Sequence, residues 1–197
     1  MLSSRTALLC GMLFLSACAS VTRAPVAVDP AEISAFDLTG RVSVRVENKG
    51  YPPGRIRWQH APGADEVWIY TPVGSTVARM RQDASGALVV TSDGKEYKAD
   101  DMKLLAGEVL GWNLPIDGLQ YWVRGLPWPA LDRTSEEYDA DGRPKSLSQG
   151  GWEVAYLDWS PAGVPGLPSK LDVAGEGLRL RLIIEKWKVE GRGERAR

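Results

Sequence analysis

The sequence is poor in the residues that commonly carry acid–base, redox and metal chemistry. Among 197 residues it has one histidine, His60, and two cysteines, Cys10 and Cys18. Nucleophilic catalysis needs a base beside the nucleophile, and no Gly-x-Ser-x-Gly turn accompanies His60. A single histidine cannot build a zinc site, and the paired acidic residues lack the spacing of a calcium loop. We therefore expect no enzyme, no metal and no cofactor, and interpret His60 as a partly exposed turn residue.

An excess of charge and a long hydrophobic run are also lacking. The 24 basic residues face 25 acidic ones, which gives a net charge of −1. Because nucleic acid binding needs a clustered basic face, we expect no nucleic acid partner. The apolar run from Ala7 to Leu15 follows Arg5 and is too short to cross a bilayer. Such a run is typical of the hydrophobic region of a signal peptide.

Cys18 ends the segment Leu15-Ser16-Ala17-Cys18, which has the pattern of the site where a bacterial lipoprotein is cut and lipidated. We predict cleavage of residues 1–17 and lipidation of Cys18, the alternative being a secreted protein without lipid. Several acyl chains on Cys18 would hold the protein permanently on a membrane. Cys10 leaves with the signal peptide, so no disulfide is expected.

Three further regions are predicted downstream of the signal peptide. Residues 18–35 comprise the lipidated cysteine and small or polar residues with two prolines, which favour a flexible tether. Residues 36–189 form a single domain, and the charged tail 190–197 is expected to be disordered.

Period-two alternation predicts a mainly β domain. Val42, Val44 and Val46 alternate with polar residues, which is typical of a half-buried strand. Similar strands are predicted at 55–60, 67–70, 77–80 and 87–90, as an antiparallel meander. Two short amphipathic helices are predicted at about 102–110 and 116–124, before strands at 152–157, 170–173 and 178–182. The simplest architecture is one curved sheet with a helical insert.

The chain has eight tryptophans and only two phenylalanines. These rings can fill an ordinary β core, or they can line an apolar cavity enclosed by the curved sheet and the helices. The sequence leaves both possibilities open. Strand and helix phase give the candidate cavity residues, and a register slip of one would move the strand set to the other face: Val42, Val44, Ile56, Trp58, Val67, Ile69, Leu119 and Trp122.

Several short motifs follow the lipidation site and extend across the predicted domain: Thr39-Gly40-Arg41, Ile56-Arg57-Trp58-Gln59, Thr71-Pro72-Val73-Gly74-Ser75-Thr76, Trp122-Val123-Arg124-Gly125-Leu126-Pro127, Gly151-Trp152-Glu153-Val154-Ala155-Tyr156 and Ile184-Glu185-Lys186-Trp187. In these motifs and in their order, the sequence resembles the LolB family of outer-membrane lipoprotein receptors.

The resemblance implies a single open antiparallel β-barrel in which helices form a lid over an apolar cavity. A monomer of this kind would sit on the periplasmic face of the outer membrane of a Gram-negative bacterium. It would accept lipoproteins from the periplasmic carrier LolA through their acyl chains and insert them into that membrane. No nucleotide or metal is implied.

The same resemblance assigns Pro72, Val73 and Gly74 to a loop that helps insert cargo into the membrane. The family's leucine at the tip is replaced by Val73, which is one methylene shorter. Val73 could instead be a turn residue that packs under its own hairpin.

Two other functions remain open from the residues alone. A scaffold lipoprotein of an envelope-assembly complex would explain the lipid anchor and an aromatic β core, and a lipid-modifying enzyme would explain a cavity but lacks catalytic groups. The alternating strand arginines are interpreted as a solvated outer face, with docking to a carrier or to anionic lipid as the alternative.

Overall fold

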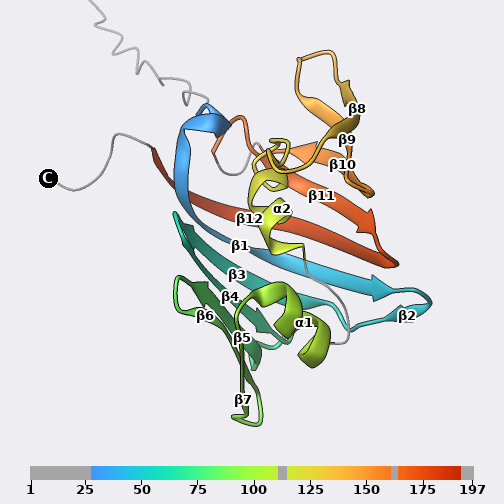
Figure 1. Cartoon of the computed structure of the whole chain (residues 1–197). Helices are drawn as coiled ribbons and strands as arrows, with labels where there is room; N and C mark the ends of the chain where they lie inside the picture. Colours follow the sequence, from blue (N-terminus) through green and yellow to red (C-terminus); the bar gives the residue numbers. More distant parts are fainter. Residues whose placement is uncertain (1–27, 111–114, 161–163, 192–197) are drawn as a thin grey trace, which may run out of the picture.

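The computed structural model describes residues 28–110, 115–160 and 164–191. In this part of the chain nearly every segment belongs to one twelve-stranded antiparallel sheet (Figure 1). The strands are β1 (Ile33–Val46), β2 (Lys49–Gly50), β3 (Gly54–Ala61), β4 (Ala64–Tyr70), β5 (Thr76–Asp83), β6 (Gly86–Thr91), β7 (Glu96–Ala99), β8 (Arg133–Tyr138), β9 (Pro144–Gln149), β10 (Trp152–Trp159), β11 (Pro168–Gly175) and β12 (Leu178–Gly191).

The sheet is a meander whose two halves join at its centre. The strand order is β7-β6-β5-β4-β3-β1-β12-β11-β10-β9-β8, and β2 pairs with β1 alone. The two longest strands, β1 and β12, pair along their whole length, from Ile33 with Gly191 to Val46 with Leu178. The sheet curves, and β7 and β8 form its open edges (Figure 1). The predicted class, a mainly β protein with one open curved antiparallel sheet, is confirmed.

Two short helices lie on the concave side of the sheet (Figure 1). Helix α1 (Met102–Leu110) packs against β5, β6 and β7, and the Asp101 carboxylate accepts a hydrogen bond from the Leu104 N–H at 2.8 Å as its N-terminal cap. Helix α2 (Ile116–Trp122) runs across the middle of the concave face. Among the described residues, no helix is long and apolar enough to span a bilayer.

The core lies between the helices and the concave face. Alternate strand residues point inward, such as Leu38 on β1 and Val89 on β6, both fully buried. From α1 and α2 the buried side chains Leu105 and Leu119 meet this layer. Burial of these apolar faces is the main favourable contribution to folding.

Gly40 is required where β1 changes register against β12. The pairing shifts between Thr39 and Gly40, and a Cβ at Gly40 would overlap the backbone oxygen of Ile183. Only glycine allows the two backbones to approach this closely. The irregularity lies midway along the longest strand pair, where it helps that pair to curve.

The predicted elements are present, but several boundaries differ and further strands occur. Strand β1 begins at Ile33 rather than after residue 35, and β12 continues to Gly191, so the sheet takes in both predicted domain boundaries. The second helix ends at Trp122, two residues before the predicted end. Strands β2, β7, β8 and β9 lack a clear apolar alternation and were not predicted. Gly111, which we expect to cap the C-terminal end of the first helix, lies outside the described residues.

His60 lies at the end of the predicted strand 55–60, but its interpretation as a partly exposed turn residue is wrong. His60 lies within β3, opposite Asp65 of β4, and its side chain is largely buried. Its ring stacks on that of Phe36 at 4.9 Å. The apolar ring face and the neighbouring carboxylate together keep it in the sheet.

Candidate functional site

An apolar cavity of about 430 Å³ lies between the concave face of the sheet and the two helices. Its walls come from β1, β3, β4, β5 and β12, and its roof from Val109 of α1 and Ile116 and Leu119 of α2. The remaining lining residues are Val42, Val44, Tyr51, Pro52, Pro53, Gly54, Ile56, Trp58, Val67, Ile69, Tyr70, Thr71, Pro72, Val77, Ala78, Met80, Leu180 and Leu182. No charged side chain is among them, so the cavity suits an apolar ligand.

Strand register orders the walls from one end of the cavity to the other. At one end lie the loop residues Pro52, Pro53 and Pro72, which are exposed and form its mouth. Further in, Ile56 pairs with Ile69, and Ile69 pairs with Ala78. The next inward-facing row is Trp58, Val67 and Met80, which are all buried. The cavity is therefore a channel that runs along the strands from an open to a closed end.

The structure brings together seven of the eight predicted cavity residues. Val42, Val44, Ile56, Trp58, Val67, Ile69 and Leu119 all line the cavity. Trp122 does not, and its assignment is corrected. Its indole N–H donates to the Gln149 side-chain oxygen at 3.1 Å, and its ring lies beside those of Trp128 and Trp152. A polar partner thus turns the Trp122 side chain away from the cavity.

Trp122, Trp128 and Trp152 form a second aromatic cluster beside the cavity. Sequence reasoning missed Gln149, the polar residue at its centre. Its side chain is 1% exposed and makes four hydrogen bonds. The side-chain oxygen accepts from Trp122 and from the Trp128 N–H at 2.8 Å, while the amide nitrogen donates to the carbonyls of Trp128 and Leu131 at 2.7 and 2.8 Å. The available signal was alternation, since Leu147 and Gln149 share the inner face of β9.

Arg124 is a second buried polar residue. It belongs to the motif Trp122–Pro127, but the sequence alone gave it no role. Its guanidinium donates to the Ile33 carbonyl at 2.7 Å and to the Gln120 carbonyl at 2.8 Å. Burial lowers the pKa of Arg124. These bonds tie the end of α2 to the first residue of β1, so the roof of the cavity is fixed to the sheet.

The loop between β4 and β5 projects from the mouth of the cavity. The loop is closed by a backbone bond from the Thr71 N–H to the Ser75 carbonyl, and the Ser75 N–H donates to the Thr71 hydroxyl oxygen. Gly74 adopts a φ of +97° that favours glycine. Thr71 and Pro72 line the mouth, whereas Val73 is 90% exposed. Val73 therefore does not pack under its own hairpin, and it presents an apolar tip to the solvent.

The strand arginines lie on the convex face, mostly in ion pairs. The Asp37 carboxylate accepts two hydrogen bonds from Arg57, at 3.0 and 2.6 Å, and one from Gln59 at 3.2 Å. The bonds from Arg57 lower the pKa of Asp37. Other pairs on this face are Arg41–Glu185, Arg79–Glu66 and Arg181–Asp172. This arrangement fits the interpretation as a solvated outer face, where each exposed pair contributes little to stability.

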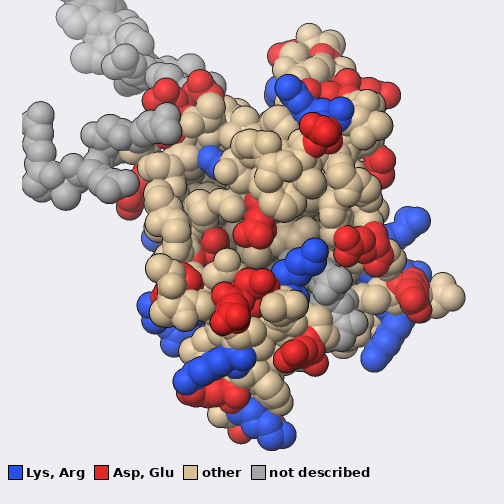
Figure 2. Space-filling model, in the orientation of Figure 1, with Lys and Arg blue, Asp and Glu red and all other residues tan. Residues whose placement is uncertain are grey.

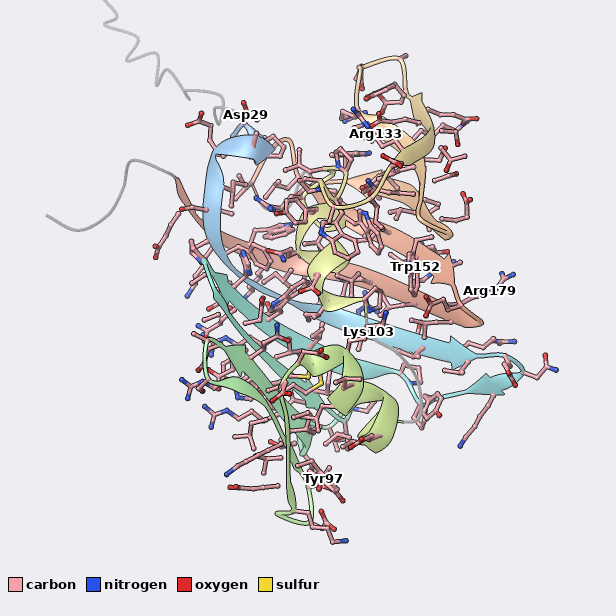
Figure 3. The ribbon with its side chains drawn as sticks, in the orientation of Figure 1. Asp29, Tyr97, Lys103, Arg133, Trp152 and Arg179 are labelled. Carbon is pink, nitrogen blue, oxygen red and sulfur yellow. The ribbon has the colours of Figure 1, made fainter. Side chains whose placement is uncertain are left out.

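Exposed charges of both signs are mixed over the molecule. Figure 2 shows lysine and arginine interspersed with aspartate and glutamate on the face that carries the helices. Arg179 projects outward at the end of the hairpin between β11 and β12 (Figure 3). On α2, burial and the nearby carboxylates of Asp65 and Asp101 raise the pKa of Asp117. Within the described ranges, no cluster of three or more histidine, cysteine, aspartate or glutamate residues could hold a metal ion.

Residues 34–187 match the model of the family described as outer membrane lipoprotein LolB. The chain is 38% identical over 176 residues to the outer-membrane lipoprotein LolB of Azoarcus sp. strain BH72, covering 89% of this chain and 90% of that protein. It is 33% identical over 186 residues to the protein of the same name from Chromobacterium violaceum, covering 93% and 98%. A DUF1329 family protein from Desulfovibrio piger has a similar fold, with a TM-score of 0.51 and 8% identity over 82% of this chain and 88% of that one.

Proposed function

The chain belongs to the LolB family of outer-membrane lipoproteins, and from this premise we propose that it accepts lipoproteins from the periplasmic carrier LolA by taking their acyl chains into the cavity. Membership of the family confirms the sequence resemblance. It makes the chain a lipid-anchored receptor of lipoprotein localisation at the outer membrane of a Gram-negative bacterium. The carrier, the acyl-chain ligand and the insertion step are the parts that the proposal adds.

One observation carries the proposal: the cavity is apolar along its length and open at one end beside an exposed apolar loop. An acyl chain that enters between Pro53 and Pro72 leaves water and meets aliphatic and aromatic side chains. Burial of each methylene group contributes about 0.8 kcal/mol. Acceptance and release break no covalent bond, so the direction of transfer follows from the relative affinities of carrier, receptor and membrane.

Val73 is the residue that we propose contacts the membrane when cargo is released. Its side chain stands at the mouth of the cavity and is free to enter the apolar part of a bilayer. Because Val73 directly follows Pro72, which lines the mouth, the proposed release site is next to the proposed point of membrane contact. Pro72, Val73 and Gly74 together are the proposed membrane-insertion loop.

The direct test mixes the mature protein with cargo-loaded LolA and follows movement of the cargo. Ala78 is buried in the middle of the cavity wall, so Ala78→Phe would fill space that a chain would occupy. Displacement of about two methylene groups costs about 1.6 kcal/mol, so we expect acceptance to fall about fifteenfold. Ala84→Phe, in an exposed turn outside the cavity, is the matched control. Equal acceptance by the wild-type protein and Ala78→Phe would contradict the cavity as the cargo site.

Cys18 lies outside the described residues, and its lipidation remains a prediction. If the lipid serves only as an anchor, Cys18→Ala in a chain directed to the periplasm should accept cargo within about twofold of the wild-type protein. Cargo retention by the released variant can be measured by co-purification. Loss of acceptance by a folded Cys18→Ala variant would show that the anchor takes part in cargo binding.

The cavity distinguishes the proposed receptor function from the alternative, a scaffold lipoprotein. A scaffold with an aromatic β core has no use for a channel of about 430 Å³ that opens beside an apolar loop. It predicts that the wild-type protein takes no cargo from LolA under any condition.

A further inference from the structure

We infer that Trp58 is the end wall of the cavity and sets the length of acyl chain that the protein accepts. The inference rests on the proposed function, since it assumes that the cavity holds an acyl chain with its methyl end inward. It concerns the closed end of the channel and does not depend on the exposed loop or on the mouth.

Strand register places Trp58 at that closed end. On β3 the inward positions Gly54, Ile56 and Trp58 line the cavity in turn, and the next one, His60, does not. The same limit holds on β1, where Val42 lines the cavity while Leu38, the register partner of Trp58, is fully buried outside it. Trp58 follows Gly54 by four positions along the strand, so the wall stands about 13 Å inward from Gly54.

Side chains behind Trp58 hold its indole in place. The indole N–H donates to the Asp65 carboxylate at 2.7 Å, and the Phe36 ring packs edge-on against the indole at 5.1 Å. The same Asp65 oxygen lies 2.9 Å from His60 Nδ1, and His60 stacks on Phe36. A carboxylate only accepts hydrogen bonds, so it fixes both the indole and the imidazole by their N–H groups.

This arrangement differs from that of an ordinary core tryptophan. The indole presents its ring to the cavity while its only polar atom bonds to a residue outside the cavity lining. A chain end that reaches Trp58 therefore meets a rigid apolar wall. Asp65 is a positioning residue that acts through Trp58, and His60 and Phe36 complete the support.

The test compares binding of lauric, myristic, palmitic and stearic acid to the mature chain carrying Cys18→Ala, so that its own lipid is absent. In the otherwise unchanged protein, affinity should rise with chain length until the chain end meets Trp58, and then level off. Trp58→Phe replaces the indole with a smaller ring and so lengthens the cavity. Affinity should then continue to rise for longer chains, by about fourfold for each further methylene group accommodated. An affinity profile of Trp58→Phe parallel to that of the parent would overturn the inference.

Asp65→Ala provides a second variant that leaves the tryptophan in place. Freed from its hydrogen bond, the indole should yield to longer chains, and the plateau should move in the same direction by a smaller amount. Asp172→Ala, which removes an acid paired with Arg181 on the convex face, should leave the profile unchanged. An Asp65→Ala profile identical to that of Asp172→Ala would count against the support of Trp58 by Asp65, and would overturn the inference if Trp58→Phe does not fold.

A fatty acid that carries bromine at its methyl end gives an independent readout, because bromine quenches the fluorescence of an indole that it contacts. We expect quenching in the parent protein that is lost in Trp58→Phe, and quenching that persists in both proteins would overturn the end-wall assignment. Failure of the parent to bind any of the four acids would instead overturn the proposed function, and the inference with it.

Discussion

Gln149→Leu is expected to lower the free energy of unfolding by about 4 kcal/mol, because four buried or partly buried polar groups lose their partners at once. These groups are the Trp122 indole N–H, the Trp128 N–H and the carbonyls of Trp128 and Leu131. Each buried group left unpaired costs about 1 to 3 kcal/mol, and relaxation of the loop around Trp128 recovers part of the total. Urea unfolding followed by tryptophan fluorescence measures the change.

Gln59→Leu is the matched control for this substitution. Gln59 is partly buried on the convex face and donates one hydrogen bond, to Asp37 at 3.2 Å. Its replacement should cost less than about 1 kcal/mol. If Gln149→Leu costs no more than Gln59→Leu, the network around Gln149 does not hold the second aromatic cluster together.

Val73→Glu is expected to reduce delivery of cargo to liposomes about thirtyfold while leaving acceptance from LolA unchanged. Full burial of a valine side chain in an apolar phase contributes about 2 kcal/mol, and a carboxylate forfeits this contribution. Folding should be unaffected because the side chain is 90% exposed and makes no core contact. A liposome transfer assay with labelled cargo measures acceptance and delivery as separate steps.

Two further substitutions test whether the effect of Val73→Glu is specific to the loop. Val73→Leu adds one methylene group and should deliver cargo at least as well as the wild-type protein. Leu157→Glu introduces the same charge at an exposed apolar residue of β10, away from the loop, and should deliver normally. Equal delivery by Val73→Glu and Leu157→Glu would mean that the loop does not enter the membrane.

The strands that sequence reasoning found are those with one buried and one solvated face. In β1 and β12, buried valine and leucine alternate with exposed arginine, and the period of two is clear. Strand β8 has no buried residue, and β9 has only Leu147 and Gln149. Because β8 is the edge strand and β9 is its neighbour, their sequences carry little apolar pattern, and pairing with neighbours defines them as strands instead.

The candidate cavity followed from the same alternation, and its one misplaced residue has a geometric cause. Leu119 and Trp122 are three residues apart on α2, which leaves them about 60° apart around the helix axis. That angle allows Leu119 to face the cavity while Trp122 turns toward Gln149. The sequence placed both residues on one stripe, but the buried hydrogen-bond acceptor that separates them lies 27 residues further along the chain.

The mouth and the end wall could not be predicted in the same way. Tyr51, Pro52 and Pro53 belong to a loop, where no periodicity fixes which side chains face inward. Trp58 was predicted as one wall residue among several. Its position at the closed end depends on Asp65 and Phe36, which strand pairing and side-chain packing bring together.

The pairing of β1 with β12 also determines when the cavity can exist. Its floor combines Val42 and Val44 with Leu180 and Leu182, so it joins residues from opposite ends of the chain. Such long-range contacts form late in folding, and during synthesis they must wait until the last strand has emerged. A nascent chain that lacks β12 therefore lacks part of the cavity floor, and capture of a stray lipid in the cavity is deferred until the whole domain has folded.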